Sequence, residues 1–268
     1  MSPLGQRILT GALLAFAVVM TILWAPTLVV ALLSAGVAFL ASMEWRGLQQ
    51  GKSRRQILYG LIAVVVTLSL SWTYPMLPSV VGLVAAAWAL GLFWVAWRAL
   101  RGRPFRIYSG EVLGLLVLCP SLALIPYAHG LGREGPQLLL MILGLVWASD
   151  IGAFFIGRRW GLHKLAPTVS PGKTWEGAAG GILVGVTAGF LLATAIESWH
   201  LNSATLIIIL LLCAWCGVMS DLFESMVKRS ANRKDSGSLL PGHGGVLDRI
   251  DSMLGVLPVF LGLMLLLG

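Results

Sequence analysis

The chain has 268 residues, of which 57% are hydrophobic and only 11% are charged, and its formal net charge is +8. This composition departs far from that of soluble globular domains, so it excludes an ordinary soluble protein and indicates an integral membrane protein. Membrane topology and anionic lipid are sufficient reasons for the positive charge, and we therefore expect no nucleic-acid partner.

Nine apolar runs approach the length of about 20 residues that a membrane-spanning helix requires. They cover residues 8–24, 27–43, 56–73, 78–97, 109–127, 136–156, 177–196, 204–220 and 252–267. The first run is expected to be retained as a span rather than removed as a signal peptide, because further apolar sequence follows it. We therefore predict an all-α polytopic membrane protein with about nine transmembrane helices.

The polar residues are distributed unevenly along these runs. We expect one integral membrane domain over residues 1–268, in which residues 1–130 are mainly scaffold spans and residues 136–268 carry the polar site. In the first part, Glu44 and Glu111 lie near Arg46 and Arg106, and surface ion pairing is the expected role of these four residues.

The basic residues predict the orientation of the chain. If nine spans alternate across the bilayer, all but Arg133 of the 19 Lys and Arg residues fall on one side. Loops rich in Lys and Arg remain in the cytoplasm. The N-terminus and the segment 221–251 are therefore expected in the cytoplasm, and the C-terminus on the other side.

The sixth run contains a carboxylate, Asp150, and continues in apolar residues to Ile156. A charge at this depth is costly and by default marks a polar cavity or a charged partner. The alternative is a neutral or locally paired residue at a helix contact.

The loop that follows the sixth run contains the sequence Ser170-Pro-Gly-Lys173-Thr, and we interpret Lys173 as a lysine directed at phosphate. The alternative is a charge that only sets orientation. Glycines at the start of the seventh run would permit close helix contact, namely Gly177, Gly180, Gly181 and Gly185.

Charged residues are concentrated between Asp221 and Asp251, where five of the 11 acidic residues lie beside five basic ones. The eighth apolar run enters this segment without a break. Asp221, Ser225 and Lys228 therefore share a helical face at spacings of four and three, with Glu224 beside them.

A second helix is predicted after the turn Pro241-Gly-His243-Gly-Gly, with Asp248, Asp251 and Ser252 on one face. Two helix ends can thus bring carboxylates together. The glycines allow close approach of the backbone to a ligand, and the free N–H groups of a helix N-terminus bind phosphates. The pattern is typical of a charged ligand that is held with a cation.

The residues from Ser225 to Asp251 closely resemble the signature of phosphatidate cytidylyltransferases, also called CDP-diacylglycerol synthases. The matching positions are Ser225, Lys228-Arg229, Lys234-Asp235-Ser-Gly237 and Leu240-Pro-Gly-His-Gly-Gly-Val-Leu-Asp248-Arg249-Ile-Asp251. Residues 147–177, with Asp150 and the Ser-Pro-x-Lys-Thr-x-Glu-Gly run, are similar to a second polar region of that family. Together the two regions cover less than a quarter of the chain.

The resemblance implies a Mg²⁺-dependent enzyme of the cell inner membrane that joins CTP and phosphatidic acid to give CDP-diacylglycerol and pyrophosphate. The active-site loops would lie in the cytoplasm, open to a membrane lipid and a soluble nucleotide. A lipid phosphate has a second pKa of about 6, so the nucleophile is largely dianionic and needs no strong general base. The number of metal ions stays open, as do a second or monovalent cation and a homodimer.

We therefore assign the acids to metal binding, with Asp221 and Asp248 as direct Mg²⁺ ligands and Asp251 as a third ligand or an outer partner. The expected catalytic residues are Asp221, Asp248, Lys228 and His243. The expected substrate-binding residues are Asp150, Ser170, Lys173, Ser225, Lys228, Arg229, Gly244, Gly245 and Arg249.

Two other classes of function remain open at this stage. A secondary transporter also carries intramembrane acids and glycine-rich helices, but it predicts polar groups near the middle of the bilayer, whereas here they gather at one face. A CTP-dependent transferase or kinase could act on a different lipid, because nothing in the apolar runs specifies the headgroup.

Overall fold

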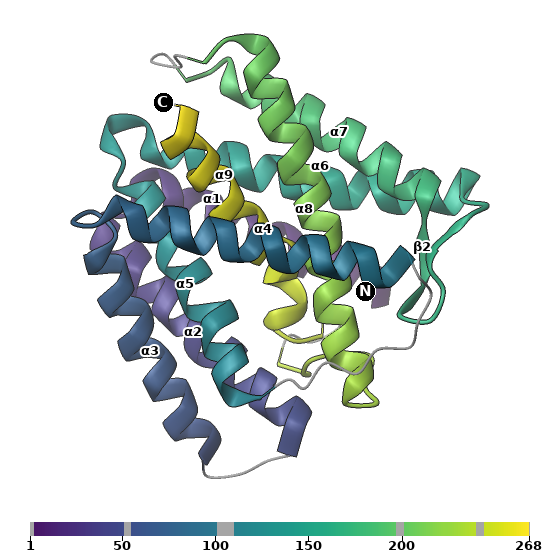
Figure 1. Ribbon diagram of the computed structural model, residues 1–268, viewed down its shortest axis with the longest axis horizontal. Coiled ribbons are helices and arrows are strands. Elements are labelled where there is room, and N and C mark those ends of the chain that lie inside the picture. The colour runs from purple at the N-terminus through teal and green to yellow at the C-terminus, as the bar shows by residue number, and fades with distance from the viewer. Residues whose placement is uncertain (1–2, 51–54, 101–109, 197–200, 240–243, 268) are drawn as a thin grey trace.

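The computed structural model describes residues 3–50, 55–100, 110–196, 201–239 and 244–267, which form a bundle of long helices (Figure 1). The α-helices in these ranges are α1 (Pro3–Trp24), α2 (Thr27–Gln50), α3 (Arg55–Thr73), α4 (Pro78–Leu100), α5 (Glu111–His129), α6 (Gly135–Trp160), α7 (Trp175–Ala193), α8 (Ser203–Ser230) and α9 (Leu247–Leu267). A short 3₁₀ helix, η1 (Gly132–Glu134), precedes α6, and the strands β1 (Lys164–Ala166) and β2 (Ser170–Thr174) lie between α6 and α7.

Each of the nine predicted apolar runs overlaps with one of these helices, which confirms an all-α polytopic membrane protein. Helices α2 to α9 are long and apolar enough to cross a membrane, and α1 contains a shorter apolar segment, Gly11–Trp24. Large apolar side chains also remain exposed on the outer faces of the bundle. Examples are Ile57, Leu61, Val65, Leu83, Leu90 and Phe93. Such faces suit contact with lipid, because hydrocarbon solvates them as well as a protein core does.

Several helices continue beyond the apolar runs into polar sequence. Helix α6 extends to Trp160 and α8 to Ser230, and α9 already begins at Leu247. Side-chain oxygens accept hydrogen bonds from free N–H groups in the first turns of two helices: Asn202 Oδ1 from Thr205 N (2.9 Å), and Thr174 Oγ1 from Gly177 N (3.1 Å). The charged residues near the ends of α6, α8 and α9 therefore lie on helices rather than in loops.

Small residues allow α6 and α7 to pack closely along most of their length. A Cβ atom at Gly181 would lie 2.6 Å from the Ser149 carbonyl oxygen, and one at Gly185 would lie 2.8 Å from the Leu145 carbonyl oxygen. Side chains at these two positions would force the helices apart. The expected role of these glycines in close helix contact is confirmed.

Residues 157–177, which we expected to form only a loop, also contain an antiparallel hairpin. Lys164 lies opposite Thr174, and Ala166 opposite Ser170. These strands are too short, with three and five residues, to show the alternation by which a strand is usually predicted.

Contacts at both ends fix the hairpin to the bundle. Glu176 accepts hydrogen bonds from the backbone N–H groups of Leu162 (3.1 Å) and His163 (3.2 Å), and it pairs with His163 Nδ1 (2.5 Å). At the turn, Arg229 Nε donates to the Val169 carbonyl oxygen (3.1 Å). The hairpin is therefore attached to α7 and α8.

The contact between α6 and α7 leads to a test of stability. We expect Gly181→Val to lower the free energy of unfolding by about 1–3 kcal/mol or more, because the added atoms have no space. Thermal unfolding of the purified protein in detergent would measure the loss.

The matched control is Gly91→Val on α4, where a Cβ atom would meet nothing within 4 Å. Equal melting temperatures for the two variants would contradict the close packing of α6 on α7.

Candidate active site

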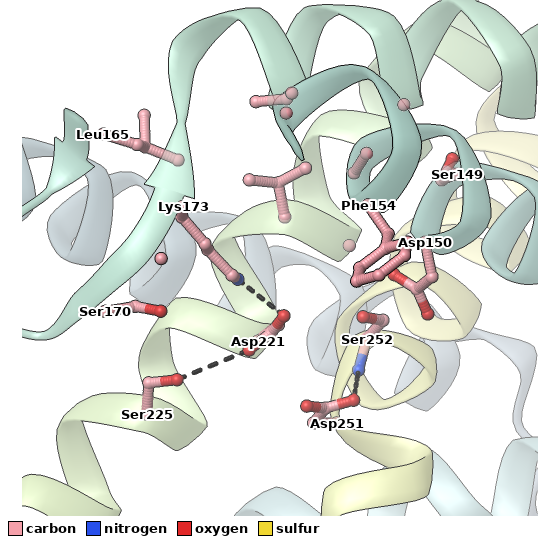
Figure 2. Close-up of a pocket in the computed structure, with 18 of the residues that line it drawn as sticks. Ser149, Asp150, Phe154, Leu165, Ser170, Lys173, Asp221, Ser225, Asp251 and Ser252 are labelled. Carbon is pink, nitrogen blue, oxygen red and sulfur yellow. Dashed lines mark hydrogen bonds and ion pairs between the residues drawn. The ribbon is translucent and has the colours of Figure 1, made fainter. Parts of the chain in front are cut away.

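A cavity of about 800 Å³ lies among α6, α7, the hairpin, α8 and α9, and most of the predicted site residues line it (Figure 2). These residues are Asp150, Ser170, Lys173, Ser225, Asp221, Lys228, Arg229, Asp248, Arg249 and Asp251. His243 lies outside the described residues, so its expected catalytic role stays a prediction.

The hairpin contributes a lysine to this cavity. Lys173 Nζ lies 2.6 Å from Asp221 Oδ2, so the ion pair connects β2 with α8 (Figure 2). Ser225, one helical turn after Asp221, lies on the same side, and its Oγ is 3.4 Å from Asp221 Oδ1. The predicted helical face of Asp221, Ser225 and Lys228 is therefore turned towards the cavity.

A second lysine connects the two charged helix ends. Lys228 Nζ forms an ion pair with Glu224 on its own helix and with Asp248 on α9, at 2.7 Å from Asp248 Oδ1. The side chains of Glu224, Asp248 and Lys228 are 2%, 8% and 11% exposed. Charges as deeply placed as these require partners, because a buried unpaired charge is strongly destabilising.

Asp248 is held by the loop before α9 as well as by Lys228. Its Oδ2 accepts hydrogen bonds from Gly245 N (2.8 Å), Ser236 N (3.0 Å) and Ser236 Oγ (3.0 Å). Gly244 adopts a φ of +85°, which favours glycine, and a Cβ atom there would lie 2.8 Å from Asp248 Oδ2. Gly244 and Gly245, expected to bind substrate, contact the Asp248 carboxylate in this structure.

Three carboxylates form the part of the site that can hold a metal ion. Oxygen atoms of Asp221, Glu224 and Asp251 all lie within 4.8 Å of one another. Glu224 Oε1 is buried and accepts no hydrogen bond from the described residues, although the carboxylate pairs with Lys228. A set of carboxylate oxygens with an unsatisfied acceptor fits a hard cation such as Mg²⁺.

This cluster differs in one member from the metal ligands expected from the sequence. Asp221 and Asp251 are brought together from α8 and α9, but the third acid beside them is Glu224, while Asp248 pairs with Lys228. From the sequence, Glu224 was expected beside the functional helical face, but no role was assigned to it. Its spacing of three residues from Asp221 and four from Lys228 is the signal that could have identified it.

Asp150 enters the cavity from α6, where Figure 2 shows it near Phe154 and Ser252. The preceding residue, Ser149, is 8% exposed, and its Oγ has no hydrogen-bond partner among the described residues. Asp150 and Ser149 thus both line the cavity. Of the two interpretations of Asp150 from the sequence, this position favours a carboxylate that faces a polar cavity.

Two residues that do not line the cavity, but bond to Asp248 or to the start of α9, were missed. Ser236 bonds to Asp248 as described above, and its Oγ also lies 2.9 Å from Glu44 Oε2 on α2, so that its single proton can be donated to either carboxylate. Glu44 was expected to form a surface ion pair, but the structure shows it bonded to the start of α9. Arg46 instead pairs with Glu111; the arginine is 2% exposed and the glutamate 43%, so only the acid of this pair lies at the surface. Arg106 lies outside the described residues.

Comparison with known proteins shows the family to which the chain belongs. The sequence profile of the cytidylyltransferase family matches residues 5–267. A phosphatidate cytidylyltransferase of Pseudomonas aeruginosa is 34% identical over 256 residues, which cover 87% of each chain. One from Brucella melitensis is 33% identical over 94% of this chain and 90% of its own, and one from Haemophilus influenzae is 42% identical over 51% and 52%. The chain therefore belongs to the cytidylyltransferase family.

Proposed function

We propose that the chain transfers the cytidylyl group of CTP to phosphatidic acid, forming CDP-diacylglycerol and pyrophosphate. The observation that carries this proposal is the cavity in which Lys173 and Lys228 form ion pairs with acids of α8 and α9. Several relatives, similar over most of their length, are named phosphatidate cytidylyltransferases, which favours phosphatidate as the lipid.

The reaction requires positive charge at several fixed points. An oxygen of the lipid phosphate attacks the α-phosphorus of CTP, and pyrophosphate leaves with the electrons of the broken bond. The oxygens on the α-phosphorus and the leaving pyrophosphate carry negative charge that positioned cations must stabilise. Lys173, Arg229 and Arg249 line the cavity, and they are the cations that we assign to the phosphates.

Lys228 has a more constrained role in this proposal. An ammonium group has three N–H donors, and two of them are directed at Glu224 and Asp248. The third can reach a phosphate oxygen, because Lys228 also lines the cavity. Asp248 therefore positions Lys228, and it keeps the charge of this lysine fixed beside the bound substrates.

We infer that Asp221 and Asp251, with Glu224, hold Mg²⁺. When bound, Mg²⁺ neutralises charge on phosphate oxygens and orients them. Proteins usually bind this ion through one or two carboxylates together with substrate phosphates and water, which agrees with the place of Asp221 and Asp251 at the wall of the cavity. A monovalent or second cation is compatible with the same donor set.

The proposal also includes the place of the site in the cell. The relatives come from bacteria, and the distribution of basic residues favours an inner-membrane protein whose cavity opens to the cytoplasm. There the site would be accessible both to cytoplasmic CTP and to lipid in the bilayer. A homodimer is compatible with the apolar outer faces, which equally suit lipid.

The proposed reaction can be tested with CTP labelled in turn at the α- and γ-phosphates, supplied with phosphatidic acid and Mg²⁺ to the purified protein. We expect the α-label in the lipid product and the γ-label in pyrophosphate. Transfer of the γ-label to lipid would show a kinase instead. Transfer of neither label would contradict both and favour a transporter.

The two groups of acids should respond differently to Mg²⁺. We expect Asp221→Asn to lower turnover by about 100-fold or more and to raise the Mg²⁺ concentration at half-maximal activity, because a charged ligand is lost. Asp248→Asn should also lower turnover, through Lys228, but with little change in that concentration. Mg²⁺ titrations of the initial rate would measure both effects.

Glu134→Gln, in η1 at the other end of α6, is the control for the loss of an acid outside the cavity. If Asp248→Asn raised the Mg²⁺ requirement as much as Asp221→Asn does, both acids would be direct ligands, as expected from the sequence, and the separate role proposed for Asp248 would be wrong.

The orientation can be tested with single cysteines in a background without the three native ones. We expect Lys234→Cys to react with a membrane-impermeant maleimide only from the cytoplasmic side, and Arg133→Cys only from the other side, because both side chains are exposed. Labelling of sealed vesicles of known orientation would show the difference. Labelling of both positions from the same side would contradict the topology.

A further inference from the structure

Glu44 lies on α2, in the part of the chain that we expected to be scaffold, yet its side chain reaches the loop before α9. Its Oε1 accepts a hydrogen bond from Val246 N and its Oε2 one from Leu247 N, both at 2.9 Å. Leu247 is the first residue of α9. The first N–H groups of a helix have no partner within it, and a carboxylate there also interacts favourably with the helix dipole.

The surroundings of Glu44 are closely fitted to its carboxylate. A Cβ atom at Gly237 would lie 2.6 Å from Glu44 Oε1, and one at Gly245 would overlap with both Glu44 Oε2 and Ser236 Oγ. Glycine is therefore required at these two positions for the loop to enclose the carboxylate. This explains two glycines of the polar segment that do not line the cavity.

Ser236 connects Glu44 with the site. Its Oγ lies 2.9 Å from Glu44 Oε2 and 3.0 Å from Asp248 Oδ2. A hydroxyl group has one proton to donate, so it can satisfy only one of these carboxylates at a time. Ser236 itself is 2% exposed, which keeps water from competing for either bond.

These contacts form a continuous path from α2 to the cavity: Glu44 to Ser236, Ser236 to Asp248, and Asp248 to Lys228. Glu44 also fixes the first residue of α9, and Asp248 follows in the next position. A shift at the start of α9 would therefore displace Asp248 directly and Asp251 one helical turn later.

We infer that Glu44 is a positioning residue, which sets the place of the Asp248–Lys228 pair through the start of α9 and through Ser236. The inference rests on the proposed function, because it assigns Glu44 to the geometry of that site. Glu44 is not among the described residues that line the cavity, and it has no direct contact with substrate in this assignment.

The test is steady-state kinetics of Glu44→Gln in the full-length protein, with CTP, phosphatidic acid and Mg²⁺. Glutamine keeps the shape but replaces one acceptor oxygen with an NH₂ group, which cannot accept from Val246 or Leu247. We expect kcat per folded molecule to fall by about 10- to 100-fold, as is typical of partners that orient catalytic groups. The KM for CTP should change by less than about threefold, because no binding group is removed.

Ser236→Ala provides a second variant should Glu44→Gln fold poorly, since it removes only the shared hydroxyl; we expect it to lower kcat in the same way by about 10-fold. Glu111→Gln is the matched control: it removes an acid that pairs with Arg46 outside the cavity. It should lower thermal stability and leave kcat per folded molecule unchanged.

The possible outcomes separate the inference from the proposed function. If the unmodified protein makes CDP-diacylglycerol and both variants keep its kcat per folded molecule, Glu44 is not a positioning residue and the function stands. A loss of activity only in proportion to the folded fraction would likewise overturn the inference. If the unmodified protein forms no product, the proposed function fails, and the inference fails with it.

Discussion

Lys228 carries a positive charge that lies between two carboxylates on different helices, Glu224 on α8 and Asp248 on α9. In an interior that solvates charge poorly, removal of one partner of such a pair costs about 3–5 kcal/mol. The pairing of charges and the packing of α8 against α9 therefore stabilise each other. Lys228 and Asp248 also line the cavity, so that an intact fold already presents this lysine and this acid in fixed positions. Preorganised charge of this kind is what phosphoryl transfer needs from a protein.

The length of α8 explains how such charges can be accommodated in a membrane protein. Its 28 residues extend over about 42 Å, whereas the hydrocarbon core of a bilayer is about 30 Å thick. The last turns, from Asp221 to Lys228, can thus extend into the interfacial region while the apolar part of the helix spans the membrane. A lipid phosphate lies at this level, and soluble nucleotides can reach it. The charged helix end therefore brings the two substrates of the proposed reaction to the same depth.

The sequence was sufficient to predict what depends on local pattern and length. The nine α-helices of the described residues follow from apolar runs of the right length, and the shared face of Asp221, Ser225 and Lys228 follows from helical spacing. The contacts of Glu44 could not be predicted in this way, because its partners lie about 200 positions later and two of them are backbone groups without a residue-specific signal. The hairpin was missed since its strands are short and their pairing depends on Glu176 and Arg229 outside it.

The ion pair of Lys173 with Asp221 limits how a nucleotide can enter the site. Lys173 lies on the hairpin and Asp221 on α8, so their attraction holds the hairpin over the cavity. If Lys173 turns towards a phosphate, Asp221 loses its positively charged partner. The Asp221 carboxylate would then be repelled by Glu224 and Asp251, so it must gain another positive charge at the same time. A triphosphate alone would supply only negative charge and would leave Asp221 uncompensated. We therefore expect the site to accept the nucleotide together with its cation. The phosphate then replaces Asp221 as the partner of Lys173, and the cation replaces Lys173 as the partner of Asp221, so that no charge is left unpaired.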